Sequence, residues 1–406
     1  MGHLGAVALG GLAVGCGLLA WSAAFLNFLA YGTTARAARR TGAGDRAGAV
    51  SEGVQATWLA LGLGILLALV FQLVAGPLTR LLAGGAGPVA DAAEQWLRVA
   101  SPGLPLLLVS LAGNGWLRGV QELRRPMGYV LAGNGIGVVL CPLLVHPMGL
   151  GLVGSALANV AGQTVSAVLF AGALVRELNR SGVSWRPRPA ALRAQLVLGR
   201  DLLVRAAVLQ LAFAAAAAVV ARSGTAELGA HQIALQLWLF LALVLDAYAI
   251  AAQTLVGSAL GADRPDDARR TASRVVRWGL GTGIAVAALL LALRPLLPPL
   301  FTDDPAVLAQ AGVVWWFLAL MQPLAGVVFA LDGVLMGAGD AAFLRTVTLA
   351  SALLGFVPLS LLSGWLDWGL PGVWTGLTLF IALRLVAVLW RVAGDRWLTA
   401  PGTVSV

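Results

Sequence analysis

One carboxylate lies in the middle of a long apolar stretch. Asp246 is flanked by LALVL and AYAIAA inside a run at about 226–258. A charged residue at the centre of a membrane costs about 2.5–3.5 kcal/mol on insertion scales, so such residues face a cavity or a partner. Because removal from water favours the neutral acid, this position suits a group that carries a proton. The alternative is a structural hydrogen bond to a neighbouring helix.

Other polar residues interrupt the apolar stretches with less specific patterns. His231 and Gln232 lie near the outer end of the same run and are candidate contacts for a ligand or a proton, although a packed histidine is the commoner situation. Asp332 lies near the end of a run at 305–336, where an interfacial cap or an interhelix bond is the favoured interpretation. Asp201 and Arg205 are four residues apart, which predicts an ion pair along one helix face.

The sequence contains no pattern that indicates catalysis. It has no phosphate-binding loop of the GxxxxGK[ST] type, no Ser-His-Asp arrangement and no cluster with metal-ligand spacing. We therefore expect no enzyme activity, no catalytic or metal residues and no cofactor. Any energy source would be an ion gradient.

Composition and hydropathy indicate a membrane protein. Hydrophobic residues make up 59% of the chain and charged residues only 11%. Because a bilayer core requires about 20 apolar residues per helix, the sequence predicts eleven spans, at about 4–32, 55–77, 92–117, 127–147, 150–176, 196–221, 226–258, 272–299, 305–336, 343–363 and 369–393.

The arginines predict the orientation of these spans. All 27 basic residues are arginine, and most lie in alternate connections, at 33–54, 118–126, 177–195 and 260–271 and after residue 390. Cytoplasmic loops carry the excess of basic residues, so we expect a multi-pass cell-membrane protein with a cytoplasmic C-terminus. This placement of the net charge of +9 argues against nucleic acid as a partner.

Matched residues recur 218 positions apart, which indicates a duplicated unit. Pro105 repeats as Pro323, Gly115 as Gly333 and Gly119 as Gly337. With a slip of one residue, Asn27 is the counterpart of Asp246, so Asn27 is also a candidate site residue. The counterpart of the span at 196–221 would precede residue 1. The alternation of basic connections also predicts an additional helix there, because a twelfth helix would place both termini in the cytoplasm.

These observations predict an all-α membrane protein of two helical bundles related by a pseudo-twofold axis, with eleven of an expected twelve transmembrane helices. We expect a five-helix bundle at 1–178, a cytoplasmic linker at 179–195, a six-helix bundle at 196–395 and a tail at 396–406.

Several strings resemble the MATE (multidrug and toxin extrusion) family of transporters, in particular its DinF-like branch. They are, in order along nearly the whole chain, GHLGAVALGGLAVG with FLNFLAYGTTARAARRTGAGD, then GWLRGVQELRRP (115–126), GRDLLVRAAVLQLAF (199–213), the stretch at 228–263, and LFTDDPAVL (300–308). The resemblance implies two six-helix bundles around a central cavity, as in other MATE and MOP folds, and a cation site formed by acids on the first and fifth family helices.

The chain departs from the family pattern at this cation site. The fifth family helix, typically LNVVLDPLLV, corresponds here to AGNGIGVVLCPLLVHP, so Cys141 stands in place of the aspartate and Gly137 in place of the asparagine. Asn134 in the same segment and Asn159, in place of a family threonine, are the remaining polar candidates. We therefore expect coupling to have moved, with Asp246 as the leading candidate, or to be lost.

The expected function is secondary active efflux, in which proton or sodium entry drives export of a small amphiphilic or cationic compound by alternating access. We expect a monomer whose other partner is the lipid bilayer. A lipid-linked precursor flippase is an alternative, disfavoured by the scarcity of mid-span arginines, and a non-transporting membrane scaffold is another. An apolar stretch with an aspartate in the upstream reading frame would favour efflux.

Overall fold

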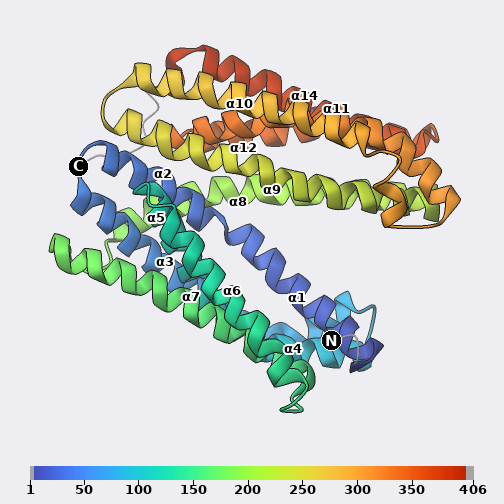
Figure 1. Ribbon diagram of the computed structural model, residues 1–406, viewed down its shortest axis with the longest axis horizontal. Coiled ribbons are helices and arrows are strands. Elements are labelled where there is room, and N and C mark those ends of the chain that lie inside the picture. Colours follow the sequence, from blue (N-terminus) through green and yellow to red (C-terminus); the bar gives the residue numbers. More distant parts are fainter. Residues whose placement is uncertain (1–3, 399–406) are drawn as a thin grey trace. The chain divides into compact units, whose positions relative to one another are not determined.

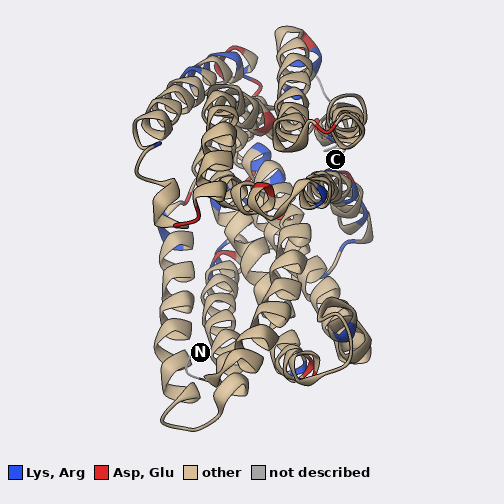
Figure 2. Cartoon of the chain, turned by 90° about the vertical axis from the view of Figure 1, so that its right-hand side faces the viewer, with Lys and Arg blue, Asp and Glu red and all other residues tan. Residues whose placement is uncertain are grey.

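The computed structural model describes residues 4–398, and this part of the chain is helical without any β-strand (Figure 1). It forms two compact units, residues 1–199 and 200–406. Eleven spans in the described part are long and apolar enough to cross a membrane, which confirms the expected number. Long stretches of these helices carry no charged side chain (Figure 2).

The first unit contains seven helices and the beginning of an eighth. They are α1 (Ala6–Leu26), α2 (Phe28–Gly42), α3 (Arg46–Leu82), α4 (Pro88–Ala100), the short 3-10 turn η2 (Ser101–Gly103), α5 (Leu104–Gly119), α6 (Arg124–Val145), α7 (Gly151–Ser181) and the first part of α8 (Pro189–Ser223). In this unit α6 packs along α7, and α3 and α2 both pack against α5.

The second unit contains the rest of α8 and the helices that follow it. These are α9 (Thr225–Gly261), α10 (Pro265–Ala292), η3 (Pro298–Leu300), α11 (Pro305–Gly337), α12 (Ala341–Ser351), the π-helical turn η4 (Ala352–Phe356), α13 (Val357–Trp365), α14 (Gly369–Ala393) and η5 (Asp395–Trp397). Here α11 packs closely against α9, α10 and α14, as its central place among them in Figure 1 illustrates.

Several helices extend beyond the spans expected from hydropathy. Both α3 and α9 contain 37 residues, which at about 1.5 Å per residue exceeds the roughly 30 Å hydrocarbon core. Hydropathy marks only the part in contact with lipid, whereas the helical hydrogen bonding continues into the polar loops. Similarly, α8 begins at Pro189, inside the segment 179–195 that we expected to be a linker. Proline at this position favours the first turn of a helix.

The two units differ in where their helices are interrupted. The expected span at 4–32 is divided at Asn27, which is both the C-cap of α1 and the N-cap of α2. In contrast, α9 continues through Asp246 without interruption. Similarly, η2 separates α4 from α5 just before Pro105, whereas α11 includes its counterpart Pro323. The two units therefore share matching helical spans, but spans that are interrupted in the first unit are continuous in the second.

The same glycine contacts recur in both units. A Cβ atom added to Gly115 would lie 2.7 Å from the Cα atom of Ala30, and one added to Gly333 would lie 2.6 Å from the Cα atom of Ala249. One helical turn later, Gly119 and Gly337 approach the backbone oxygens of Thr34 and Gln253. Each unit thus packs one helix against another through glycine, since lipid gives helices no hydrophobic reason to associate.

We predict that Gly333→Ala destabilises the protein by about 1–3 kcal/mol, because the added methyl group must push α11 away from the α9 backbone. The matched control is Gly281→Ala on α10, where an added Cβ atom meets nothing within 4 Å. Thermal unfolding of the purified variants in detergent measures both effects. A Gly333→Ala variant that unfolds at the same temperature as the Gly281→Ala variant would contradict the close contact.

Candidate functional site

A buried ionic cluster joins three helices of the second unit. Asp332 on α11 accepts hydrogen bonds at one oxygen, Oδ2, from Arg205 on α8 and from Arg384 on α14, the latter at 2.5 Å. The side chains of Asp332 and Arg384 are each only 4% exposed, and that of Arg205 is 16% exposed. We call these three residues the arginine–aspartate triad.

The triad leaves part of its hydrogen-bonding capacity unused. Among the described residues, no partner meets the Nε atoms of Arg205 and Arg384 or the second oxygen, Oδ1, of Asp332. The guanidinium of Arg384 also lies over the ring of Phe380, with 5.6 Å between Cζ and the ring centroid. The ionic contacts therefore hold α8, α11 and α14 together but do not saturate the charged groups.

The charge balance of the triad affects the candidacy of Asp332 for ion coupling. Two guanidinium groups face one carboxylate, so the three side chains carry a net charge of one positive unit. A net positive group of this kind repels a sodium ion or another cation. The interhelix bond favoured for Asp332 from the sequence matches its position, and we do not retain this residue as a coupling candidate.

A second set of ion pairs joins α8 and α14 to α12 and to the residue before it. Asp201 on α8 pairs with its neighbour Arg200 at 3.0 Å and with Arg345 on α12 at 2.6 Å. Asp340, the residue before α12, pairs with Arg391 of α14 at 2.7 Å. The expected pair between Asp201 and Arg205 along one helix face is therefore wrong, because each of these residues points to a partner on another helix.

Asp246 lies on α9, in the helix that packs through Gly333 against α11. Its side chain is half-buried, and it is three residues from Ala249, the residue that faces Gly333. Two residues beyond it, the hydroxyl groups of Tyr248 and Thr282 are 2.6 Å apart and connect α9 to α10. The carboxylate is thus part of a polar section of an otherwise apolar helix.

The other candidates on α9 lie far from Asp246. His231 is fully buried, its ring meets that of Trp374 edge-on at 5.9 Å between centroids, and neither ring nitrogen has a partner among the described residues. Gln232 is exposed. Fifteen residues of helix separate His231 from Asp246, about 22 Å along the axis. One small ligand therefore cannot contact both side chains.

The candidates of the first unit lie on three helices. Cys141 is half-buried on α6, and the other cysteine, Cys16 on α1, is exposed. Asn134 on α6 and Asn159 on α7 are both exposed, and Asn27 is half-buried at the break between α1 and α2. In the part of the chain that the structure describes, no hydrogen bond joins any of these side chains to another candidate.

Sequence reasoning missed two buried charged residues. Arg384 is visible in the sequence as a lone arginine inside the apolar run at 369–393. Glu52, which is 5% exposed, forms a bidentate ion pair with Arg36, with hydrogen bonds of 2.7 and 3.0 Å, and this pair connects α3 to α2. No sequence signal distinguished Glu52, because it falls in a charged connection.

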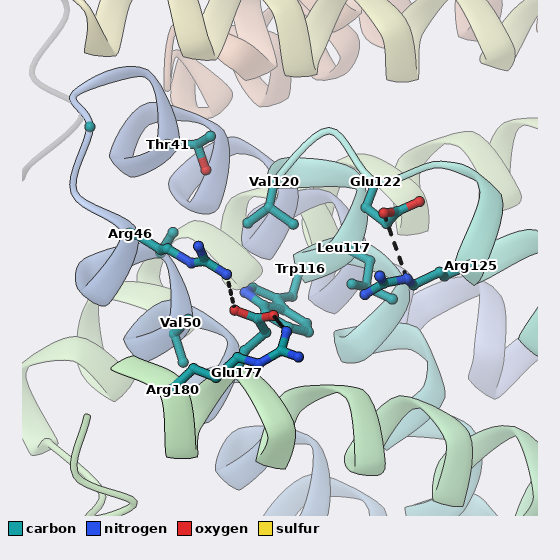
Figure 3. A pocket seen from close by; sticks show the side chains of 12 residues that line it. Thr41, Arg46, Val50, Trp116, Leu117, Val120, Glu122, Arg125, Glu177 and Arg180 are labelled. Atoms are coloured by element: carbon teal, nitrogen blue, oxygen red, sulfur yellow. Dashed lines mark hydrogen bonds and ion pairs between the residues drawn. The ribbon is translucent and has the colours of Figure 1, made fainter. Parts of the chain in front are cut away.

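A cavity of about 430 Å³ opens at one end of the first unit (Figure 3). Its floor is apolar, with Val50, Leu117 and Trp116, and its rim is charged. In the rim Glu177 bridges Arg46 at 2.5 Å and Arg180 at 3.1 Å, as the dashed lines show. The cavity is formed by the ends of α2, α3, α5 and α7, by the start of α6 and by the connections between these helices.

We predict that Asp332→Asn destabilises the protein by about 3–5 kcal/mol, because it leaves two buried guanidinium groups without their counter-charge. Arg205→Gln should cost clearly less, since one arginine and one aspartate remain as a balanced pair. Thermal unfolding in detergent ranks the two variants. The reverse order, with Arg205→Gln as the less stable protein, would contradict this assignment of charges.

Comparisons with known proteins agree with this architecture. A sequence model of the family described as MatE matches residues 1–143 and 202–361. The DNA damage-inducible protein F of Escherichia coli is 31% identical over 404 residues, which cover 96% of this chain and 86% of the relative. Among solved structures, one titled as MATE in the bent conformation superposes with a TM-score of 0.88 over 96% of this chain and 89% of that one, at 21% identity.

A plant relative shows how lengths differ within this group. Protein DETOXIFICATION 44, chloroplastic, of Arabidopsis thaliana is 36% identical over 82% of this chain but only 64% of its own length. The chain thus spans less than two thirds of the first plant relatives it matches. The family model and the bacterial relative both cover most of the chain, and eleven apolar helices make it a multi-pass membrane protein. The chain therefore belongs to the MATE family of transporters, which are not enzymes, and within it to the DinF-like group.

Proposed function

We propose that this protein is a secondary active efflux transporter that exports small amphiphilic or cationic organic compounds in exchange for protons or sodium ions. In this proposal the bundles at 1–178 and 196–395, joined by the segment 179–195, which includes the first turns of α8, and followed by the tail at 396–406, move against each other to give alternating access. The protein acts as a monomer in the cell membrane. Membership of the MATE family and the names of relatives, such as DETOXIFICATION, support export of foreign compounds.

The proposed coupling residue follows from a comparison of the two carboxylates in the apolar helices of the second unit, Asp332 and Asp246. Asp332 forms ion pairs with Arg205 and Arg384. Asp246 is half-buried on α9. A carboxylate that is partly withdrawn from water inside an apolar helix can exchange a proton or bind a cation. We therefore assign the coupling ion to Asp246, with Asn27 as its uncharged counterpart in the first unit.

The remaining candidates have secondary roles in this proposal. Cys141, Asn134 and Asn159 supply polar contacts in the first unit, and Gln232 supplies one at the far end of α9. His231 is enclosed by the core and is the weakest of the candidate contacts.

The buried arginines do not favour the flippase alternative. Arg384 is almost completely enclosed, and both it and Arg205 are bonded to Asp332. They therefore do not form the open basic surface that a lipid pyrophosphate would require. A scaffold without transport remains the alternative from another class, and a transport assay separates it from efflux.

We predict that Asp246→Asn reduces ion-driven efflux of a fluorescent organic cation to the level of cells that lack the transporter. The asparagine keeps the shape of the side chain but can no longer bind a proton or balance a cation. Efflux is followed by the loss of fluorescence from preloaded cells, with the amount of protein in the membrane checked in parallel.

Asp303→Asn is the matched control, since it makes the same chemical change in an exposed loop. It should transport normally. Full efflux by the Asp246→Asn variant would remove Asp246 from the mechanism, and a wild-type protein without any efflux would favour the scaffold alternative.

We also predict that the C-terminus lies in the cytoplasm, because the basic connections alternate with apolar spans. A C-terminal green fluorescent protein should fluoresce, whereas alkaline phosphatase at the same position should be inactive. Active phosphatase would invert the proposed topology and, with it, the direction of the transport cycle.

A further inference from the structure

We propose that Arg205 and Arg384 hold a small monovalent anion in the second unit, and we take chloride as the probe. The proposal does not depend on transport. It follows from the charge balance and the unused donors of the arginine–aspartate triad.

The charge balance comes first. Two guanidinium groups are buried with a single carboxylate, at 16%, 4% and 4% side-chain exposure for Arg205, Asp332 and Arg384. Breaking the balance of a buried ion pair is costly, because an uncompensated charge loses its hydration without gaining a partner. Arginine does not escape this cost by losing its proton, since its guanidinium remains charged in proteins.

The neighbouring acids on the same helices do not supply the missing charge. Asp201, four residues before Arg205, is shared by Arg200 and Arg345, and Asp340 is paired with Arg391. The ion pairs on α8, α11, α12 and α14 thus contain more guanidinium groups than carboxylates, and the most deeply buried surplus lies at the triad.

The hydrogen bonds indicate the sign of the ligand. Both arginines direct Nη2 to the same oxygen of Asp332, and the Nε atom of each has no acceptor among the described residues. A guanidinium group has only donors, so the group that satisfies these atoms must be an acceptor. A water molecule accepts a hydrogen bond but leaves the surplus charge, whereas an anion meets both requirements. The free Oδ1 of Asp332 would accept from a water molecule, not from the anion.

The enclosure of the triad limits the size of the ligand. Arg384 and Asp332 are almost inaccessible, and the ring of Phe380 covers one face of the Arg384 guanidinium. A carboxylate-bearing drug or a lipid phosphate does not fit without displacing these side chains, whereas a halide ion requires little space. Bound there, the anion would strengthen the connection of α8 to α11 and α14.

The test compares thermal unfolding of the purified full-length protein in sodium chloride and in sodium gluconate at equal ionic strength. Chloride should raise the unfolding midpoint in a saturable manner by several degrees, because a ligand that binds only the folded protein stabilises it. Arg205→Gln and Arg384→Gln should each abolish the difference, because one arginine then balances one aspartate. Arg391→Gln, which removes an arginine outside the triad, should retain it.

Location of the ion is tested by crystals grown in sodium bromide. The proposal expects an anomalous bromide peak within hydrogen-bond distance of the Nε atoms of Arg205 and Arg384, and no such peak in the Arg205→Gln variant. Equal wild-type midpoints in chloride and gluconate would overturn the proposal. So would a chloride effect that persists in Arg205→Gln, because the ion would then bind elsewhere. Should Arg384→Gln fail to fold, Arg205→Gln alone decides.

Discussion

Helices in a bilayer gain little by hiding apolar surface from lipid, so their association depends on how closely their backbones approach. In each unit this approach is made by glycine, at Gly115 against Ala30 and at Gly333 against Ala249. These contacts fix α5 against α2 and α11 against α9. The other helices of each unit pack around these pairs, and the polar side chains on them take their places from this arrangement.

The position of Gly333 explains why its neighbour is so deeply buried. Asp332 precedes it on α11, so the close approach of α9 on one side leaves the carboxylate among α8 and α14 on another. Buried charges require partners, and Arg205 and Arg384 provide more positive charge than one carboxylate balances. In addition, Asp201 and Asp340 join α8 and α14 to α12 and to the residue before it.

The two carboxylates of the apolar helices therefore differ in chemistry although both were visible as interruptions of apolar sequence. Asp332 is held by arginines and serves as an anchor between helices. Asp246 is half-buried, beside a hydroxyl contact between Tyr248 and Thr282 that connects α9 to α10. The two arginines bonded to Asp332 make it a structural contact between helices, and Asp246 is the carboxylate that we propose for coupling.

The sequence by itself determined the helical class, the number of apolar spans and the duplication, because bilayer thickness and the need to satisfy backbone hydrogen bonds act on every residue of a span. It also marked Asp246 and Asp332 as unusual. Only the tertiary structure decided their partners: Arg205 and Asp332 are 127 residues apart, and Asp332 and Arg384 are 52 residues apart. Spacing along the chain carries no information about such pairs, because they depend on which faces of separate helices meet. For the same reason the expected pair of Asp201 with Arg205 was wrong although its spacing was ideal.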